Sequence, residues 1–294
     1  MPTRPTTASA TTATDAGLLR EPRELQTLVD IALDAARQAA RLVLQAHRSQ
    51  PAVERKSSYS DLVTRYDLES EQLIRRILGE RAPSIPIVGE EQGGTADDRP
   101  TWFCDPIDGT TNFAHGHAFF AVSIGLMQRG VPLLGAVVAP ALQCEWHGFV
   151  GDSSAGGGAF RNGVACTVTG PKLLADALVG TGFSPVLRGK GSPENNLAAL
   201  ARVAPQVRDI RRCGSAALDL CMVADGTYDA YWERRLSAWD VAAGAALVLA
   251  AGGQLTNLTG DAVDLTQGYL LASNGHVHAE LIELLAPDGA PTVT

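Results

Sequence analysis

The chain has 294 residues, with 24 basic and 32 acidic side chains and a formal net charge of −8 at pH 7. Hydrophobic residues make up 45% and charged residues 19%, a balance that excludes a largely disordered protein. The length suits one large domain or two ordinary ones, with a core that needs no disulfides. An acidic chain without a basic run is a poor candidate for sequence-independent nucleic-acid binding, which depends on neutralising phosphates.

Cysteine and histidine spacing gives little support for a zinc site. The five cysteines are an odd number without a C-x-x-C pair, which indicates buried, reduced thiols. Two His-x-His pairs, at 115 and 117 and at 276 and 278, would place both rings on one face of a strand. With no further ligand type beside them, we expect no metal there.

The ends of the chain and its hydropathy bear on location. No run approaches the roughly 20 apolar residues of a membrane-spanning helix. The first twenty residues are rich in Thr and Ala and lack the apolar segment of a signal peptide. We therefore expect residues 1–22 to form a disordered tail and the protein to be cytoplasmic.

The first half of the chain predicts helices followed by strands. Apolar residues recur at three- and four-residue steps over 24–47, which predicts an amphipathic helix. A second helix is expected from near Asp67 to Pro83. Its expected buried residues are Leu73, Ile74, Ile77 and Leu78. Later apolar runs predict strands at 87–88, 102–104, 121–127 and 133–139, with a hairpin turn at 162–163.

From about residue 175 the pattern alternates between strand and helix. Strands are predicted at 177–182, 207–210 and 269–273, and helices at 215–224 and 241–251. The whole chain therefore predicts an α+β protein with two helix-covered sheets in sequence. Its expected parts are the tail at 1–22, an N-terminal half at 23–170 and a C-terminal half at 171–294.

The strongest local motif covers residues 102–113, where Asp105 and Asp108 follow an apolar run. Two carboxylates at this separation can converge on a hard cation, and oxygen ligands favour Mg²⁺, Ca²⁺ or Mn²⁺ over zinc. Gly109 and Thr110 follow at a possible helix N-terminus, where free amides suit a phosphate. The plainer alternative is that the aspartates merely cap the next helix. Two aspartates followed by Gly and Thr favour a metal–phosphate site.

Three further segments supply acidic residues. A short apolar run ends in Glu90, and Asp240 stands at the start of an apolar helix. Residues 56–67 include Asp61, Thr64 and Asp67 ahead of another helix. Each segment alone also suits a solvated loop or a helix cap. Their occurrence together in one chain favours a common site.

Taken together, these four segments resemble the inositol monophosphatase family, part of the lithium-sensitive, Mg²⁺-dependent phosphomonoesterases. The resemblance runs in order from about residue 24 to residue 285. It implies that the α+β fold is the family's layered αβαβα sandwich.

The resemblance also implies a site with two to three Mg²⁺ ions. One ion would be held by Glu90, Asp105 and the carbonyl of Ile107. Another would be held by Asp105, Asp108 and Asp240, with Asp105 bridging the two. A third, looser ion would lie near Glu90 and residues 56–67.

Catalysis is implied by the same resemblance. Thr110, oriented by Asp67, would share with Glu90 the task of positioning and deprotonating a water that attacks phosphorus in line. The metals would lower the pKa of this water and stabilise the leaving alkoxide, so no phosphoenzyme is required. The amides of Gly109 and Thr110 would hold the phosphate.

The resemblance further implies that the alcohol part of the substrate would meet a second group of residues. Ala216 would lie beside the ring, and Asp108, Asp240 and Glu233 would lie close to it, with Glu233 accepting hydrogen bonds from ring hydroxyls. Glu233 could instead pair with a nearby arginine. The arginines in reach along the sequence are Arg211, Arg234 and Arg235, and the adjacent pair at 234–235 also suits a second anionic group, a solvated face or a dimer contact.

These residues predict hydrolysis of a small polyol phosphate, with myo-inositol 1-phosphate first. Thr111 favours this substrate over nucleotide bisphosphates, whose relatives tend to carry Lys there. Ala238 replaces a proline that often precedes the Trp-Asp pair. Histidinol phosphate and fructose 1,6-bisphosphate stay open as substrates. In another class, the chain would be an accessory binding factor on RNA polymerase or ribosomal RNA complexes. Family members are usually homodimers, and we expect one here.

Overall fold

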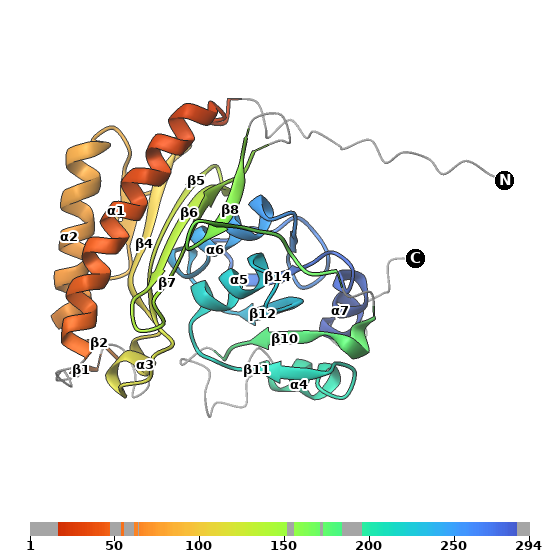
Figure 1. Ribbon diagram of the computed structural model, residues 1–294. Coiled ribbons are helices and arrows are strands. Elements are labelled where there is room, and N and C mark those ends of the chain that lie inside the picture. The colour runs from red at the N-terminus through yellow and green to blue at the C-terminus, as the bar shows by residue number, and fades with distance from the viewer. Residues whose placement is uncertain are drawn as a thin grey trace.

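The computed structural model describes residues 17–47, 54–55, 62–63, 65–151, 156–170, 173–183 and 196–286. Within these residues the chain forms five layers, in the order helix, sheet, helix, sheet, helix (Figure 1). The predicted α+β layered sandwich is confirmed. Of the predicted tail at 1–22, residues 1–16 lie outside the described residues, as do Lys56, Asp61 and Thr64 of the segment 56–67. Residues 17–22 are described, and Pro22 already belongs to the first helix.

The first layer is made by α1 (Pro22–His47) and α2 (Arg65–Arg81). The apolar stripe of α1 is buried as predicted, against the first sheet. In α2 the predicted face is partly wrong. Leu73 is only half-buried, whereas Asp67, Ser70 and Glu71 are fully buried beside the predicted Ile74, Ile77 and Leu78. The buried face of α2 therefore includes these three polar residues, which contact other segments of the chain.

The first sheet has seven strands in the order β3-β4-β5-β6-β7-β8-β9. β3 runs parallel to β4 and the other neighbours are antiparallel. The hairpin turn at 162–163 joins β8 to β9, as predicted. The bounds are β3 Ile87–Gly89, β4 Thr101–Asp108, β5 Ala121–Gln128, β6 Val131–Ala139, β7 Cys144–Phe149, β8 Gly158–Arg161 and β9 Val164–Cys166.

Two small elements lie near the end of β4. α3 (Thr110–Ala114) is a short helix that follows it directly. β1 (Glu54–Arg55) and β2 (Leu62–Val63) pair with each other as a separate antiparallel ribbon.

The middle layer is made by α5 (Ala216–Ala224) and α6 (Ala238–Ala250), which are buried almost throughout. Small residues let α6 approach the sheet closely. A Cβ on Gly125 of β5 or Gly135 of β6 would overlap the backbone of Ala243. The two halves of the chain thus meet through backbone contact, without bulky side chains between them.

The second sheet has five strands in the order β11-β10-β12-β14-β13. Its outer face is covered by α4 (Leu197–Val203) and α7 (His278–Leu285), below and to the right in Figure 1. A short 3₁₀ helix, Leu174–Asp176, precedes it. The bounds are β10 Leu178–Thr181, β11 Asp209–Arg211, β12 Ala230–Arg234, β13 Gln254–Thr256 and β14 Tyr269–Ser273.

The predicted strands and helices are present within two or three residues at most ends, and β14 matches in full. Eight of the described elements were not predicted from the sequence: β1, β2, β7, β12, β13, the 3₁₀ helix, α4 and α7. All strands of the first sheet precede residue 170 and all strands of the second follow it. The division into halves at 170 stays a prediction, because α5 and α6 pack on both sheets.

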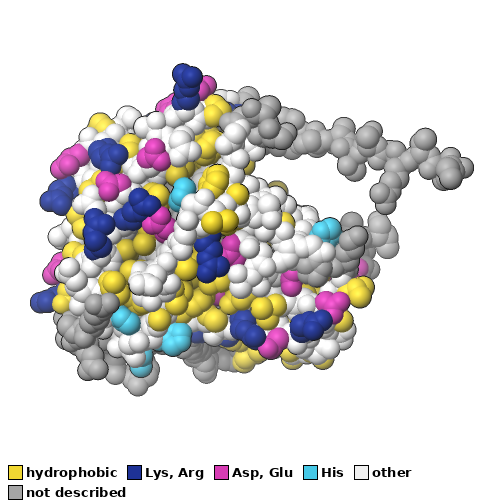
Figure 2. Space-filling view, viewed as in Figure 1, with side chains coloured by type: hydrophobic (Ala, Val, Ile, Leu, Met, Phe, Trp, Pro, Cys, Tyr) yellow, Lys and Arg dark blue, Asp and Glu magenta, His cyan; other side chains and the backbone are white. Residues whose placement is uncertain are grey.

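Charges are mixed on the surface over α1 and α2. In Figure 2 basic and acidic side chains alternate on this side of the molecule. Arg81 pairs with Asp34 at 2.7 Å, and Arg37 pairs with Glu145. This mixture agrees with the absence of a basic run in the sequence. Among the described residues, no helix combines the length and the apolar character needed to cross a membrane.

Candidate metal and phosphate site

The end of β4 carries the two aspartates of the strongest motif. β4 continues through Asp105 to Asp108, with an irregularity in its pairing between them, so Asp108 ends the strand instead of following a turn. The exposed fractions of Asp105 and Asp108 are 3% and 7%. Gly109 follows with φ of +91° and begins α3. Glycine suits this conformation because it lacks a Cβ, and a Cβ here would lie 3.2 Å from the Gly214 carbonyl oxygen.

Glu90 lies next to Asp105 because β3 and β4 are parallel neighbours. The Glu90 amide donates to the Cys104 carbonyl at 3.2 Å. The pKa of Asp105 is raised well above its ordinary value, first by burial and then by the negative charges of Glu90, Asp108 and Asp240. The four carboxylates therefore act on one another.

Asp240 joins this group from the first turn of α6. Its Oδ2 accepts a hydrogen bond of 2.7 Å from the Ser237 amide, within a capping box. Burial raises the pKa of Asp240 well above its ordinary value, and the charges of Asp108 and Glu90 raise it further. Asp240 thus belongs to the capping box of α6, in which Ser237 is the N-cap, and its carboxylate also lies among the other acidic groups. Its role as a metal ligand stays a prediction.

Asp108 is held by the N-terminus of α5. Its Oδ2 accepts hydrogen bonds from Ser215 Oγ at 2.5 Å and from the Ala217 amide at 2.7 Å. Burial raises the pKa of Asp108 to about 6, although these two hydrogen bonds lower it. Ala216 lies between the two donors and is buried.

Thr110 and Asp67 meet across two elements. Thr110 Oγ1 lies 3.4 Å from Asp67 Oδ1, and its distance to the Ile107 carbonyl oxygen is 3.0 Å. Asp67 is fully buried in the first turn of α2. The hydroxyl group is thus placed between α2 and the end of β4.

Glu233 lies on β12 and faces α5. Tyr231 Oη donates to Glu233 Oε2, and a Cβ on Gly182 would overlap the Glu233 carboxylate. Glu233 is 8% exposed. Burial raises the pKa of Asp219 on α5, and the charge of Glu233 raises it further. Arg211, one candidate partner for Glu233, instead pairs with Asp209 at 2.5 Å.

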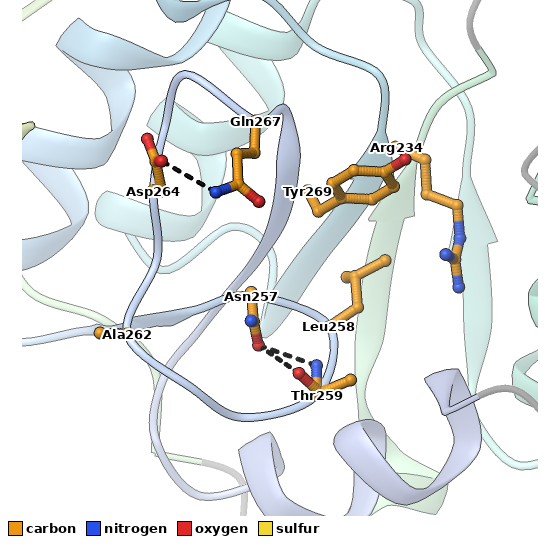
Figure 3. A pocket seen from close by; sticks show the side chains of 8 residues that line it. All are labelled: Arg234, Asn257, Leu258, Thr259, Ala262, Asp264, Gln267 and Tyr269. Carbon is orange, nitrogen blue, oxygen red and sulfur yellow. Dashed lines mark hydrogen bonds between the residues drawn. The ribbon is translucent and has the colours of Figure 1, made fainter. Parts of the chain in front are cut away.

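Arg234 faces the other side of the same sheet. Successive residues of a strand point to opposite faces. Arg234 accordingly lines a cavity of about 260 Å³ together with Asn257, Asp264 and Tyr269 (Figure 3). Its Nη2 donates to the Leu285 carbonyl at 3.3 Å. This orientation argues against contact between Arg234 and a second anionic group at the acidic cluster.

The chemistry of the donor set, which consists of carboxylate and carbonyl oxygens, suits a hard divalent cation. Burial and the neighbouring carboxylates raise the pKa of Asp105 and of Asp240, and a cation that neutralises these groups would stabilise them. Each aspartate has one oxygen fixed by a backbone amide, which for Asp105 is that of Ile107 at 2.9 Å. Within the described residues, no three His, Cys, Asp or Glu side chains converge closely enough to hold an ion as they stand.

Several residues that support the cluster were not predicted from the sequence. Ser215 appeared only within a helix start, and its bond to Asp108 depends on the tertiary fold. Glu71 and Arg75 on α2 hold the loop that carries Glu90. The signal available in the sequence was Glu71 itself, a charged residue four positions after Asp67 on the same helix face as the apolar Ile74.

One histidine of the second His-x-His pair is buried beside the second sheet. The ring of His278 is buried between Thr256 and Ser273, with hydrogen-bond distances of 2.8 and 2.7 Å. Burial lowers its pKa to about 4. The position of the His278 ring therefore indicates a role in the stability of the fold.

Comparison with known proteins gives the same family throughout. Residues 24–288 match the family model described as the inositol monophosphatase family. Inositol-1-monophosphatase SuhB of Mycobacterium tuberculosis is 44% identical over 216 residues, 69% of this chain and 71% of the relative. Nus factor SuhB of Pseudomonas aeruginosa is 37% identical over 274 residues, 92% of this chain and 99% of the relative.

The fold has the same relatives. The structure of inositol monophosphatase from Anabaena superposes with a TM-score of 0.79 at 36% identity, covering 89% of this chain and 96% of that one. Fold and similarity define the class of the protein as a phosphoric monoester hydrolase from a metal-dependent family. The chain belongs to the inositol monophosphatase family.

Proposed function

We propose that the protein is an Mg²⁺-dependent phosphomonoesterase that hydrolyses a small polyol phosphate, myo-inositol 1-phosphate before others. The observation that carries this proposal is the cluster of the buried Asp105 and Asp108 with the half-buried Glu90 and Asp240, whose charges act on one another. The likeness of the chain to proteins named inositol-1-monophosphatase supports the choice of substrate.

The proposed metal ligands come from the ends of three elements. Glu90, Asp105 and the Ile107 carbonyl would hold one ion, and Asp105, Asp108 and Asp240 another, with a third, looser ion near Glu90. Oxygen donors of this kind suit Mg²⁺. Bound Mg²⁺ lowers the pKa of a coordinated water and neutralises phosphoryl oxygens.

The chain's own groups would then position the reactants. Thr110, placed beside Asp67, would orient the attacking water together with Glu90. The amides of Gly109 and Thr110 would hold the phosphate. Asp108, fixed by Ser215, would lie close to the departing hydroxyl.

The alcohol would be recognised by Glu233 and Ala216. The Tyr231 hydroxyl fixes one oxygen of Glu233, and the absence of a side chain on Gly182 gives the carboxylate its space. The other oxygen would accept hydrogen bonds from ring hydroxyls. Ala216 would offer a small apolar contact to the ring.

A phosphate-release screen tests the proposed function. Purified protein with Mg²⁺ is offered inositol 1-phosphate, histidinol phosphate, fructose 1,6-bisphosphate and adenosine 3′,5′-bisphosphate in parallel, with a chelator control. We expect the highest kcat/KM on inositol 1-phosphate and loss of turnover with the chelator. Preference for another substrate overturns the substrate assignment, and turnover that persists with the chelator overturns the metal assignment.

Further properties belong to the same proposal through the family resemblance. We expect inhibition by Li⁺ that a Na⁺ control does not reproduce, a homodimer in solution, and a cytoplasmic location. Light scattering of the purified protein measures the oligomeric state directly.

A second candidate function is an accessory role in transcription complexes. It is favoured by the likeness to the Pseudomonas aeruginosa protein named a Nus factor, which extends over 99% of that protein. A pull-down of RNA polymerase by wild-type protein and by Asp240→Asn tests it. Equal recovery would show a binding role that is independent of catalysis.

A further inference from the structure

One face of α2 carries a row of buried polar residues that reach the functional segments. Asp67, Ser70 and Glu71 are fully buried, and Arg75 continues the row one turn later. Asp67 contacts Thr110, and Ser70 Oγ donates to the Pro106 carbonyl at 3.1 Å. The helix therefore contacts the end of β4 at two points.

Glu71 and Arg75 reach the other carboxylate-bearing segment, the loop at 89–93. Glu71 accepts hydrogen bonds from the amides of Glu91 at 2.7 Å and Gln92 at 3.1 Å. Arg75 Nε pairs with the same carboxylate at 2.7 Å, and its other nitrogens donate to the carbonyls of Ile87 and Gly93. The pair thus holds the loop from both sides.

The loop itself is built to admit this carboxylate. A Cβ on Gly89 would overlap the Glu71 carboxylate, so a side chain here would displace Glu71 from its bonds to the loop. Gly89 and Gly93 exchange backbone hydrogen bonds of 3.0 and 3.1 Å, which close the loop around Glu90. A buried charge is retained only where partners compensate its desolvation, and here those partners are loop amides and a guanidinium.

We propose that Glu71 and Arg75 are positioning residues that hold Glu90 against Asp105 and thereby set the affinity of the site for Mg²⁺. This inference rests on the proposed function, in which Glu90 is a metal ligand. Residues that orient a ligand without touching the metal change metal affinity or activity about 10- to 100-fold when replaced. The expected effect of replacing Glu71 lies in that range.

Glu71→Gln is the direct variant, because it keeps the size and leaves only one oxygen for several donors. Arg75→Lys keeps the charge and loses the forked geometry, and it serves if Glu71→Gln does not fold. Asp225→Asn is the matched control. Asp225 is also buried, pairs with Arg161 at 3.0 Å and accepts from Trp146 Nε1 at 2.9 Å, at the far end of α5 from Ser215.

Two measurements separate positioning from general stability. Calorimetric titration of Mg²⁺ into protein without substrate should show about 10-fold or greater weakening in Glu71→Gln, and no change in Asp225→Asn. Hydrogen exchange of the metal-free protein should show faster exchange at the amides of residues 91 and 92 in Glu71→Gln alone. If Glu71→Gln lowers the Tm but leaves both the Mg²⁺ affinity and the amide exchange unchanged, the inference is overturned.

A double-mutant cycle with Glu90→Gln tests whether Glu71 affects Mg²⁺ affinity through Glu90. If Glu71 acts through Glu90, Glu71→Gln will add no further loss of Mg²⁺ affinity in the Glu90→Gln background. Full additivity would overturn the inference while leaving Glu90 as a ligand. If Glu90→Gln itself leaves Mg²⁺ affinity unchanged, the proposed ligand set is wrong and the inference falls with it.

Discussion

Ser215 Oγ donates a 2.5 Å hydrogen bond to Asp108 Oδ2 across 107 residues of sequence. It links the end of β4 in the first sheet to the start of α5 in the middle layer. The same hydroxyl accepts from the Leu218 amide at 3.3 Å and so caps α5. One side chain therefore fixes both a helix start and a proposed metal ligand.

Ser215→Ala should weaken Mg²⁺ binding more at pH 6 than at pH 8. The pKa of Asp108 is raised to about 6 by burial, and the Ser215 hydrogen bond lowers it. Loss of the hydroxyl raises that pKa further, so protons compete more strongly with the metal. The measurement is half-saturating Mg²⁺ at the two pH values. An equal change at both would show that Ser215 does not act through the ionisation of Asp108. Loss of the cap should also reduce stability by about 1 kcal/mol.

Glu233→Gln should raise KM for inositol 1-phosphate severalfold. A carboxylate accepts stronger hydrogen bonds from hydroxyl groups than an amide does. p-Nitrophenyl phosphate has no ring hydroxyls, so its KM should not change. The comparison of the two substrates is the control, and an equal rise for both would place Glu233 outside alcohol recognition.

Two glycines predict opposite effects of alanine on stability. Gly125→Ala should lower the free energy of unfolding by about 1–3 kcal/mol, because its Cβ overlaps the backbone of Ala243 on α6. Gly79→Ala on α2 has open space around it and should raise stability by about 0.5–1 kcal/mol. Urea unfolding of both variants checks the close packing of the middle layer. Similar values for the two would contradict it.

Protonation of the buried His278 ring should reduce the stability of the protein in acid. Its pKa in the folded protein is lowered to about 4 by burial, against an ordinary value of 6.5. A lowered pKa favours the neutral ring, so its contribution is present above pH 6.5 and is lost as the pH falls from 6.5 to 4. The loss should reach a few kcal/mol.

Urea unfolding at pH 7, 5.5 and 4.5 measures this slope. His278→Gln should flatten it between pH 6.5 and 4, although other groups titrate in both proteins. Parallel slopes in the two proteins would show that His278 is not the group responsible.

Local pattern was sufficient for the elements whose sequence is periodic or uniformly apolar. The spacing in 24–47 predicted α1, and the apolar runs predicted β5, β6 and β14. α4 and α7 were missed because they are short and begin without a side-chain cap. β12 was missed because its charged residues suggested a site and obscured the strand.

The sequence predicted more of the candidate site residues than of the contacts that hold them in place. Glu90 directly follows β3, Asp108 ends β4 and Asp240 lies in the first turn of α6, whereas Asp105 lies within β4. Glu71 and Ser215 were not assigned these contacts, because their partners lie 20 and 107 residues away along the chain. Such contacts depend on packing between layers, which no local pattern encodes.

The most direct test of the central claim is phosphate release from inositol 1-phosphate by wild-type protein and Asp240→Asn at saturating Mg²⁺. The asparagine oxygen can still accept from the Ser237 amide, so α6 should keep its cap and the circular dichroism spectrum should be unchanged. The loss of one carboxylate should lower kcat/KM by orders of magnitude. Full activity in the folded variant would contradict the account.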